Sequence, residues 1–209
     1  EHKCSFQFYT VWLVGSSGAG KSQLRKTLEA VDTNLINEPS VHVVPDKHHE
    51  FERSHEQNQI HYYEFNGFTK YDALEERNFL KVLETQPPNI ILILIKITET
   101  IAEHQKQKIK GFLKKIRKIE KLPVWIVFTH YSMIDDRIRV SVIDGYKKEL
   151  EIEPNDQCYF IDSVEFHSGP LKIPIQGVRE LKDDIEAHFL ATSLSEELLF
   201  RESKRDKLY

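Results

Sequence analysis

Gly15-Ser16-Ser17-Gly18-Ala19-Gly20-Lys21-Ser22 is the most informative stretch of the chain, because it matches the pattern G-x-x-x-x-G-K-[ST]. The apolar, β-branched residues 6–14 precede it and predict a strand, and residues 22–31 follow it and predict a helix. Glycines allow positive φ and carry no Cβ, so successive backbone N–H groups can turn toward one anion. The N-terminus of the following helix faces the same anion. We therefore expect residues 15–22 to bind the phosphates of a nucleotide.

The residue types in this loop assign a role to each position. Lys21 is expected to neutralise the β- and γ-phosphates, and the Ser22 hydroxyl is expected to ligate Mg²⁺. Both are the catalytic candidates of the loop. The predicted nucleotide contacts within this segment are Gly15, Ser16, Ser17, Gly18, Ala19, Gly20, Lys21, Ser22 and Gln23.

Beyond the loop, strand and helix patterns alternate and predict an α/β fold. The expected strands are 41–44, 60–65, 89–97, 124–129 and 157–161, and the expected helices are 71–84, 100–121, 137–150 and one from about 177. Together with the first strand they predict a mostly parallel sheet of about six strands, with helices on both faces. Strands 41–44 and 60–65 have no helix between them, which predicts one antiparallel edge strand. We expect a single nucleotide-binding domain over residues 1–200, followed by a charged tail or helix end at 201–209.

Composition excludes several other classes of protein. The chain has 209 residues, of which 40% are hydrophobic, which is enough for a folded core. With 29 basic and 33 acidic residues the net charge is −4, so no nucleic-acid partner is expected. The longest purely aliphatic run, residues 90–95, is too short to span a bilayer. Two cysteines without paired spacing, Cys4 and Cys158, favour a reducing compartment, and we expect a cytoplasmic location.

Two further segments narrow the class of nucleotide-binding protein. Glu64-Phe65-Asn66-Gly67-Phe68 follows one predicted strand, and Thr129-His130-Tyr131-Ser132 follows another. Taken with the order of the strands, they resemble the immunity-associated nucleotide-binding GTPases (GIMAPs) and the plastid protein-import (Toc) receptors, which are relatives of septins and dynamins. The resemblance covers most of residues 8–190. It implies a P-loop GTPase that binds GTP and GDP with Mg²⁺.

The resemblance implies roles for residues around the γ-phosphate. Gly67 would donate its N–H to that phosphate, and Glu64 would replace the aspartate that holds Mg²⁺ through water. Ser40 is the candidate first-switch hydroxyl, which gives Ser22, Ser40 and Glu64 as the predicted metal-binding set. Phe68 occupies the place of a water-orienting glutamine, so slow hydrolysis is expected unless a partner supplies the missing group.

The resemblance also places the base. Thr129 and His130 match the base-recognition pair, and the imidazole is expected to stack on the purine. The aspartate that reads guanine would fall at Ser132, where it is absent, so the neighbouring pair 135–136 is an alternative. Ser163, in the loop after the last strand, is expected to meet the base from its other side.

Partners and rival functions follow from the same features. A protein partner, or a homodimer across the nucleotide face, is implied by the resemblance. Membrane contact is expected only through the basic helix Lys106 to Lys121 or through flanking segments. Two other functions remain open: a pseudo-GTPase scaffold with little or no hydrolysis, and a P-loop nucleotide kinase.

Overall fold

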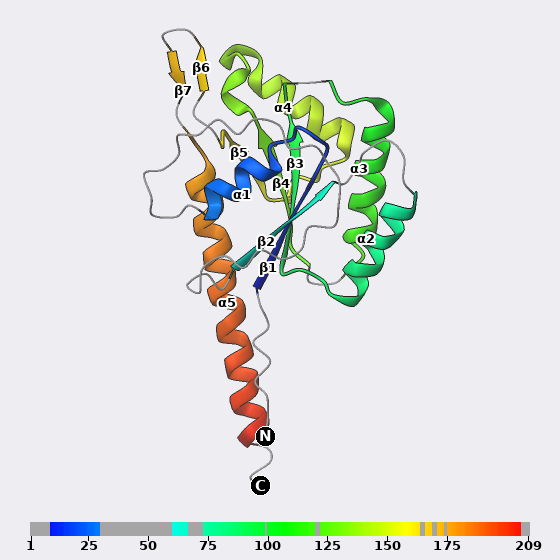
Figure 1. Cartoon of the computed structure of the whole chain (residues 1–209), viewed down its shortest axis with the longest axis vertical. Helices are drawn as coiled ribbons and strands as arrows, with labels where there is room; N and C mark the ends of the chain where they lie inside the picture. The colour runs from blue at the N-terminus through cyan, green and yellow to red at the C-terminus, as the bar shows by residue number, and fades with distance from the viewer. Residues whose placement is uncertain are drawn as a thin grey trace.

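Strands and helices alternate along the chain (Figure 1). The computed structural model describes residues 9–29, 60–66, 73–98, 100–119, 122–163, 166–168, 171–173 and 175–205. In chain order the elements are β1 (Tyr9–Gly15), α1 (Lys21–Glu29), β2 (Ile60–Asn66), α2 (Ala73–Thr85), β3 (Ile90–Lys96), α3 (Glu103–Ile116), β4 (Val124–Thr129), the 3₁₀ turn η1 (Tyr131–Met133), α4 (Asp136–Leu150), β5 (Cys158–Ile161), β6 (Phe166–Ser168), β7 (Leu171–Ile173) and α5 (Val178–Arg205). The predicted α/β class is confirmed.

The sheet in the described residues has five strands, all parallel, in the order β2-β1-β3-β4-β5. The prediction of about six strands with one antiparallel edge therefore differs from the structure. In the part of the chain described, β2 is an edge strand, and it runs parallel to β1 because the crossover through α1 returns the chain to the same end of the sheet. The predicted strand 41–44 lies outside the described residues. The short antiparallel pair β6–β7 was not predicted, because strands of three residues carry too little pattern.

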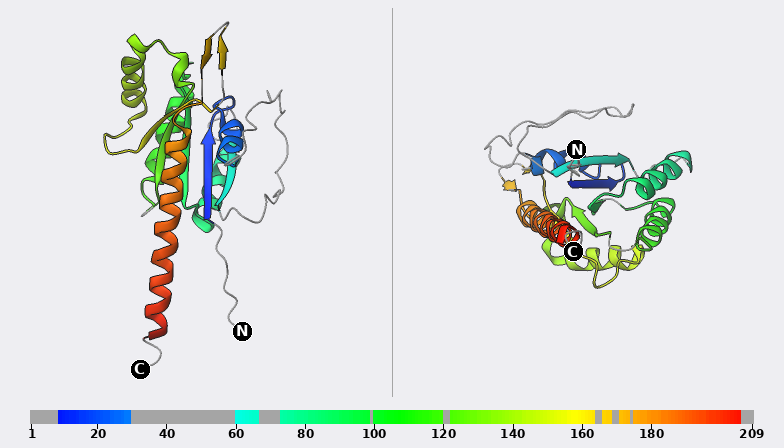
Figure 2. Two further views of the ribbon diagram at one scale, coloured as in Figure 1. Left: turned by 90° about the vertical axis from the view of Figure 1, so that its left-hand side faces the viewer. Right: turned by 90° about the horizontal axis from the view of Figure 1, so that it is seen from below.

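Helices cover both faces of the sheet, and Figure 2 shows α1 and α5 on one face with α2, α3 and α4 on the other. Alternate residues of each strand point to opposite faces. Val11 and Leu13 of β1 pack with Leu24 of α1 and Leu181 of α5. Trp12 and Val14 point the other way and belong to the core beneath α2, α3 and α4. β1 is therefore packed on both faces, and it leads into the glycine-rich segment 15–22, which we call the phosphate loop.

The central strands are buried on both faces. Every side chain from Ile90 to Ile95 is at most 2% exposed, which confirms the prediction for this aliphatic run. Trp12 of β1 and Trp125 of β4 are also in the core, at 5% and 6% exposed. Polar side chains are therefore restricted to the ends of these strands, where the candidate site lies.

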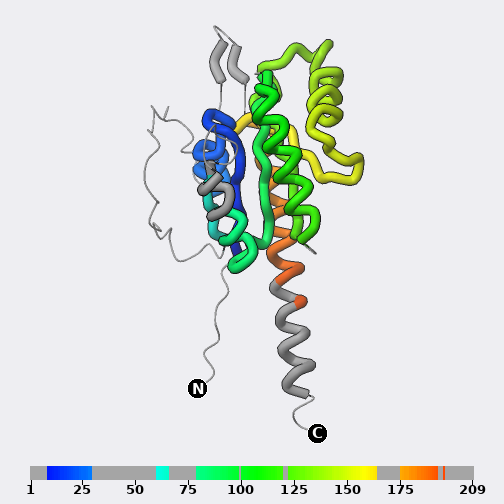
Figure 3. The backbone as a smooth tube through the Cα atoms, turned by 90° about the vertical axis from the view of Figure 1, so that its right-hand side faces the viewer, coloured from blue at the N-terminus to red at the C-terminus, as the bar shows by residue number. Residues whose placement is uncertain are grey.

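The predicted basic helix, α3, packs beside α4 (Figure 3). Its cations contact acids in the last turn of α4 and just after it. Lys106 Nζ lies 2.7 Å from Glu149, and the ammonium groups of Lys110 and Lys114 lie 3.3 and 3.2 Å from Glu151. The same two lysines hold the pKa of Glu151 below its ordinary value. This pairing reduces the charge that α3 can offer to an anionic surface, so contact with a membrane stays a prediction. Among the helices of the described residues, none has both the length and the apolar character needed to cross a bilayer.

Candidate nucleotide-binding site

The candidate site lies at the carboxyl ends of the parallel strands. β1 has β2 on one side and β3 on the other, so the strand order reverses at β1. Open parallel sheets bind ligands beyond the carboxyl ends of their strands at such a reversal. The phosphate loop begins there and leads directly into α1, as Figure 1 shows. The fold thus supports the position of the site independently of the sequence pattern.

Three glycines shape the loop for different reasons. Gly18 and Gly20 have φ of +77° and +87°, which residues with a Cβ rarely adopt. At Gly15 a Cβ would lie 2.8 Å from the Leu94 carbonyl oxygen of β3, so the sheet itself requires glycine. The Leu24 N–H donates to the Gly20 carbonyl at 2.9 Å and closes the first turn of α1. The loop therefore leads from the strand directly into the N-terminal end of α1, the end of a helix that attracts anions.

Lys21 is folded back over the loop. Its ammonium donates to the carbonyl oxygens of Gly15 and Ser16, each at 2.9 Å, and the residue is only 6% exposed. Burial lowers the pKa of Lys21, and the negative charge of Glu64 opposes that shift. Two neutral carbonyls compensate a buried cation only in part. A phosphate anion is a stronger partner for the same ammonium.

Ser22 and Glu64 are brought together from α1 and β2. The Ser22 hydroxyl donates to Glu64 Oε2 at 2.6 Å. Arg25, three residues after Ser22 on the same side of α1, places its Nε 3.1 Å from Glu64 Oε1. A hydroxyl and a carboxylate beside a phosphate loop are the oxygen ligands that Mg²⁺ prefers. The donor set therefore fits a magnesium–nucleotide complex.

The residues after β4 and β5, where the base is expected, lie beside the glycine-rich loop. The Thr129 hydroxyl, 2% exposed, donates to the Ala19 carbonyl at 3.1 Å and ties β4 to the phosphate loop. His130 follows with φ of +62°, and its Nδ1 lies 3.0 Å from the Thr129 hydroxyl. A Cβ on Gly20 would lie 4.0 Å from His130 Cε1 and 3.9 Å from Ser163 Oγ. His130 and Ser163 thus both lie next to the end of the loop.

Asp162, at the end of β5, links these two loops. Its Oδ2 accepts bonds from the Ser132 amide at 3.1 Å, the Ser132 hydroxyl at 2.6 Å and the Gln176 side-chain amide at 2.6 Å. Asp162 is 7% exposed, so these donors compensate a buried carboxylate. The Ser132 side chain, at the position where an acid was expected, is used to hold this network.

The alternative acids at 135–136 have structural partners. Asp135 caps α4 by accepting from the Arg137 amide at 2.9 Å, and the Arg137 guanidinium also binds its carboxylate. These bonds from Arg137 hold the pKa of Asp135 below its ordinary value. Asp136 forms an ion pair with Arg139 one turn later. Both carboxylates therefore contribute to the start of α4.

The structure brings most predicted site residues to one edge of the sheet. Residues 15–23, Glu64, Thr129, His130 and Ser163 all lie there. Gly67, Ser40 and Phe68 lie outside the described residues, so their roles stay predictions. Sequence reasoning missed Arg25, although its three-residue spacing from Ser22 places both on one side of a helix. It also missed Gln176, whose contact with Ser132 joins residues too far apart for local pattern to reveal.

No protein-family model matches the sequence, and no curated protein matches it. Among solved structures, this chain is similar to two mutation variants of SsGBP, with TM-scores of 0.52 and 0.51. Each match has 16% identity and covers 90% of this chain and 57% of the other. The G domain of the T. maritima FeoB iron transporter gives a TM-score of 0.47 at 18% identity, over 87% of this chain and 99% of that one.

The likeness to the SsGBP variants shows the fold alone, because identity is so low. The chain spans a little over half of their length. Fold and site together define an α/β domain with a glycine-rich strand-to-helix loop at the carboxyl edge of its parallel sheet.

Proposed function

We propose that this chain is a guanine-nucleotide-binding switch domain of the septin, dynamin and GIMAP–Toc-like branch of the P-loop GTPases. It binds GTP and GDP with Mg²⁺ and hydrolyses GTP slowly, as one domain over residues 1–200 in the cytoplasm. The proposal rests chiefly on one observation, the position of the Glu64 carboxylate beside the phosphate loop. Lys21 lies over the loop carbonyls, and Ser22 is hydrogen-bonded to Glu64 on the adjacent strand.

The described residues supply binding and charge stabilisation. Lys21 exchanges its carbonyl partners for the β- and γ-phosphate oxygens, while the loop amides surround the same anion. Ser22 would ligate Mg²⁺ and Glu64 would hold it through water, and the bound metal would supply positive charge beside the phosphates. Ser40 and Gly67 complete this arrangement as the proposed switch contacts. Release of the γ-phosphate frees both segments.

Hydrolysis is expected to be slow because Phe68 cannot orient a water molecule. A water attacking the γ-phosphate in line then depends on a group from elsewhere. A protein partner, or a second protomer across the nucleotide face, is the proposed source. Hydrolysis that accelerates with protein concentration would support the second protomer.

The guanine part of the proposal rests on the resemblance at residues 129–132. Thr129 and His130 lie next to the phosphate loop, where an imidazole can stack on a purine. Ser163 approaches the same place from the loop after β5. Asp162 connects the two loops through its hydrogen bonds with the amide and hydroxyl of Ser132.

Direct binding tests the proposal. Fluorescent GTP, GDP and ATP analogues are titrated with and without Mg²⁺, and mass spectrometry identifies any nucleotide that copurifies. We expect GTP and GDP to bind in the presence of Mg²⁺ and to bind more tightly than ATP. Preference for ATP, with turnover of a nucleotide acceptor, would instead identify a kinase.

A pseudo-GTPase scaffold is the second candidate, and one contact favours it. Glu64 is a methylene longer than the aspartate of the resemblance, and Arg25 already contacts it. In that case phosphate release from GTP stays at background, while Lys21→Ala retains binding to a protein partner. Nucleotide-dependent partner binding together with measurable phosphate release would exclude the scaffold.

A further inference from the structure

The carboxylate expected to support Mg²⁺ has partners on both oxygens. Ser22 donates to Oε2 at 2.6 Å, and Arg25 Nε lies 3.1 Å from Oε1. When the Ser22 hydroxyl donates its proton to Glu64, its oxygen keeps its lone pairs and can still ligate a metal. Arg25 differs because it brings a full positive charge to the group that a divalent cation needs.

Arg25 is held between two acids. Its Nε is also 3.8 Å from Glu29 Oε1, one turn further along α1. Burial raises the pKa of Glu29, while Arg25 lowers it and Glu64 raises it. The side chains of Glu64 and Arg25 are 22% and 39% exposed, so solvent screens their attraction only in part. Glu29 and Glu64 therefore share one guanidinium.

We propose that Arg25 competes with the divalent cation for Glu64 and thereby sets the Mg²⁺ concentration at which the nucleotide complex forms. The inference rests on the proposed function. Without metal, the guanidinium neutralises Glu64 and keeps it against Ser22. With metal, two cations are drawn to one carboxylate and repel each other, so metal binding is weaker than it would be without Arg25.

The expected effect is moderate because the pair is partly exposed. Partly exposed ion pairs contribute up to about 1 kcal/mol, which corresponds to roughly a fivefold change in affinity. Arg25→Met should therefore lower the Mg²⁺ concentration for half-maximal binding of a fluorescent GDP analogue about fivefold. High salt should shrink the difference between variant and wild type.

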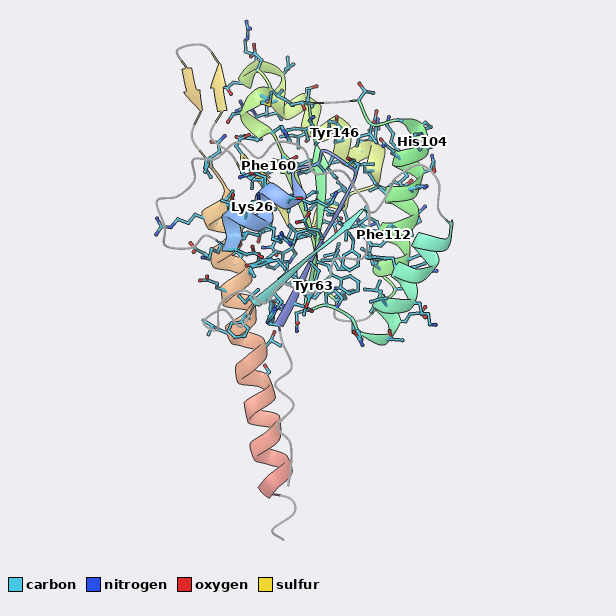
Figure 4. All side chains as sticks on the ribbon, viewed as in Figure 1. Lys26, Tyr63, His104, Phe112, Tyr146 and Phe160 are labelled. Atoms are coloured by element: carbon cyan, nitrogen blue, oxygen red, sulfur yellow. The ribbon has the colours of Figure 1, made fainter. Side chains whose placement is uncertain are left out.

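Lys26→Met is the matched control. Lys26 is the next residue of α1 and is exposed (Figure 4). Its loss removes the same charge from the same helix at an exposed position, so we expect the Mg²⁺ requirement to change by clearly less than about twofold. Arg25→Lys keeps the charge and should also remain close to wild type.

Glu29→Gln tests the same competition in the opposite direction. Removing Glu29 leaves the guanidinium entirely to Glu64, so the Mg²⁺ requirement should rise about twofold. This variant keeps the test decisive if circular dichroism shows that Arg25→Met does not fold. Substitution of Mn²⁺ for Mg²⁺ allows bound metal to be counted by electron paramagnetic resonance, without any turnover.

The outcomes separate the inference from the proposed function. An unchanged or increased Mg²⁺ requirement in folded Arg25→Met would overturn the inference, as would binding of the GDP analogue that is independent of Mg²⁺. Failure of wild type to bind any guanine nucleotide at any Mg²⁺ concentration would overturn the proposed function and, with it, the inference.

Discussion

The phosphate end and the base end of the candidate site are built in different ways. At the phosphate end, the conformation of the backbone shapes the site. Gly18 and Gly20 have positive φ, and the ammonium of Lys21 is hydrogen-bonded to backbone carbonyls. At the base end, side chains shape the site, because the Asp162 carboxylate accepts hydrogen bonds from both Ser132 and Gln176. The loop at the phosphate end depends on eight consecutive residues, whereas the base end depends on contacts between residues that are distant in the sequence.

This difference affects how each end tolerates change. A backbone cradle keeps its function while side chains around it vary, but it fails when a glycine or the lysine is replaced. A buried side-chain network stabilises the fold only while each member has a partner. We therefore expect variants at the phosphate end to reduce binding, and variants at the base end chiefly to reduce stability.

The largest effect on binding is expected for Lys21→Met. Loss of the ammonium should weaken GTP binding at least about a hundredfold, because a charge-assisted bond to phosphate is worth roughly 3 kcal/mol. The free energy of unfolding should change little, since the two hydrogen-bond acceptors of this buried ammonium are neutral carbonyls and compensate its burial only in part. Calorimetry with GTP and urea unfolding measure the two quantities. GTP binding at wild-type strength would contradict the assignment of Lys21.

The largest effect on stability is expected for Gly177→Ala, beside Gln176. A Cβ there would lie 2.1 Å from the Phe160 carbonyl oxygen, and φ is +70°. The free energy of unfolding should fall by about 3 kcal/mol or more, because backbone of β5 has to move. Gly145→Ala is the control: its Cβ meets nothing within 4 Å inside α4. That variant should gain about 0.5–1 kcal/mol. Equal stability of the two variants would contradict the close contact.

Asp162→Ala tests the network itself. The change removes the acceptor of the Ser132 amide and hydroxyl and one of the two acceptors of the Gln176 side chain, so the free energy of unfolding should fall by about 2 kcal/mol. GTP affinity should fall only a few fold, since Lys21 and the loop are intact. Asp135→Ala, which removes an exposed helix cap, should lower stability by about 1 kcal/mol. A larger loss of GTP affinity than of stability in Asp162→Ala would show that this carboxylate contacts the base.

The local parts of the fold could be predicted from the sequence. Residues 15–22 combine a strand end, a glycine turn and a helix start within one short segment, so each signal supports the others. The aliphatic run of β3 was equally clear, because a strand buried on both faces needs no alternation. Both patterns depend only on neighbouring residues.

The non-local parts could not be predicted in the same way. Nothing near Ser132 indicates that its hydroxyl binds Asp162 or that Gln176 completes the network, since those contacts form only after β4 and β5 pair. The register that puts Glu64 opposite Leu13, and so within reach of Ser22 and Arg25, is likewise a property of the assembled sheet.

The smallest effect on stability is expected at the amino end of β1, opposite the candidate site. There the Tyr9 hydroxyl lies 2.5 Å from His188 Nδ1 of α5. Burial lowers the pKa of His188 below its usual value of 6.5, so the folded state favours the neutral ring. As pH falls below about 6.5 the unfolded chain takes up the proton first, and stability present above that pH is lost.

His188→Gln should therefore lose less stability than wild type between pH 7.5 and pH 5.5, by less than about 1 kcal/mol, because the ring is partly exposed. Urea unfolding at both pH values measures the difference, with the exposed His104→Gln as control for loss of an imidazole (Figure 4). GTP affinity should be equal in all three proteins, since His188 lies at the end of β1 away from the phosphate loop. A shift in GTP affinity in His188→Gln would show that the two ends of β1 are coupled, so that a change at one end alters both stability and nucleotide binding.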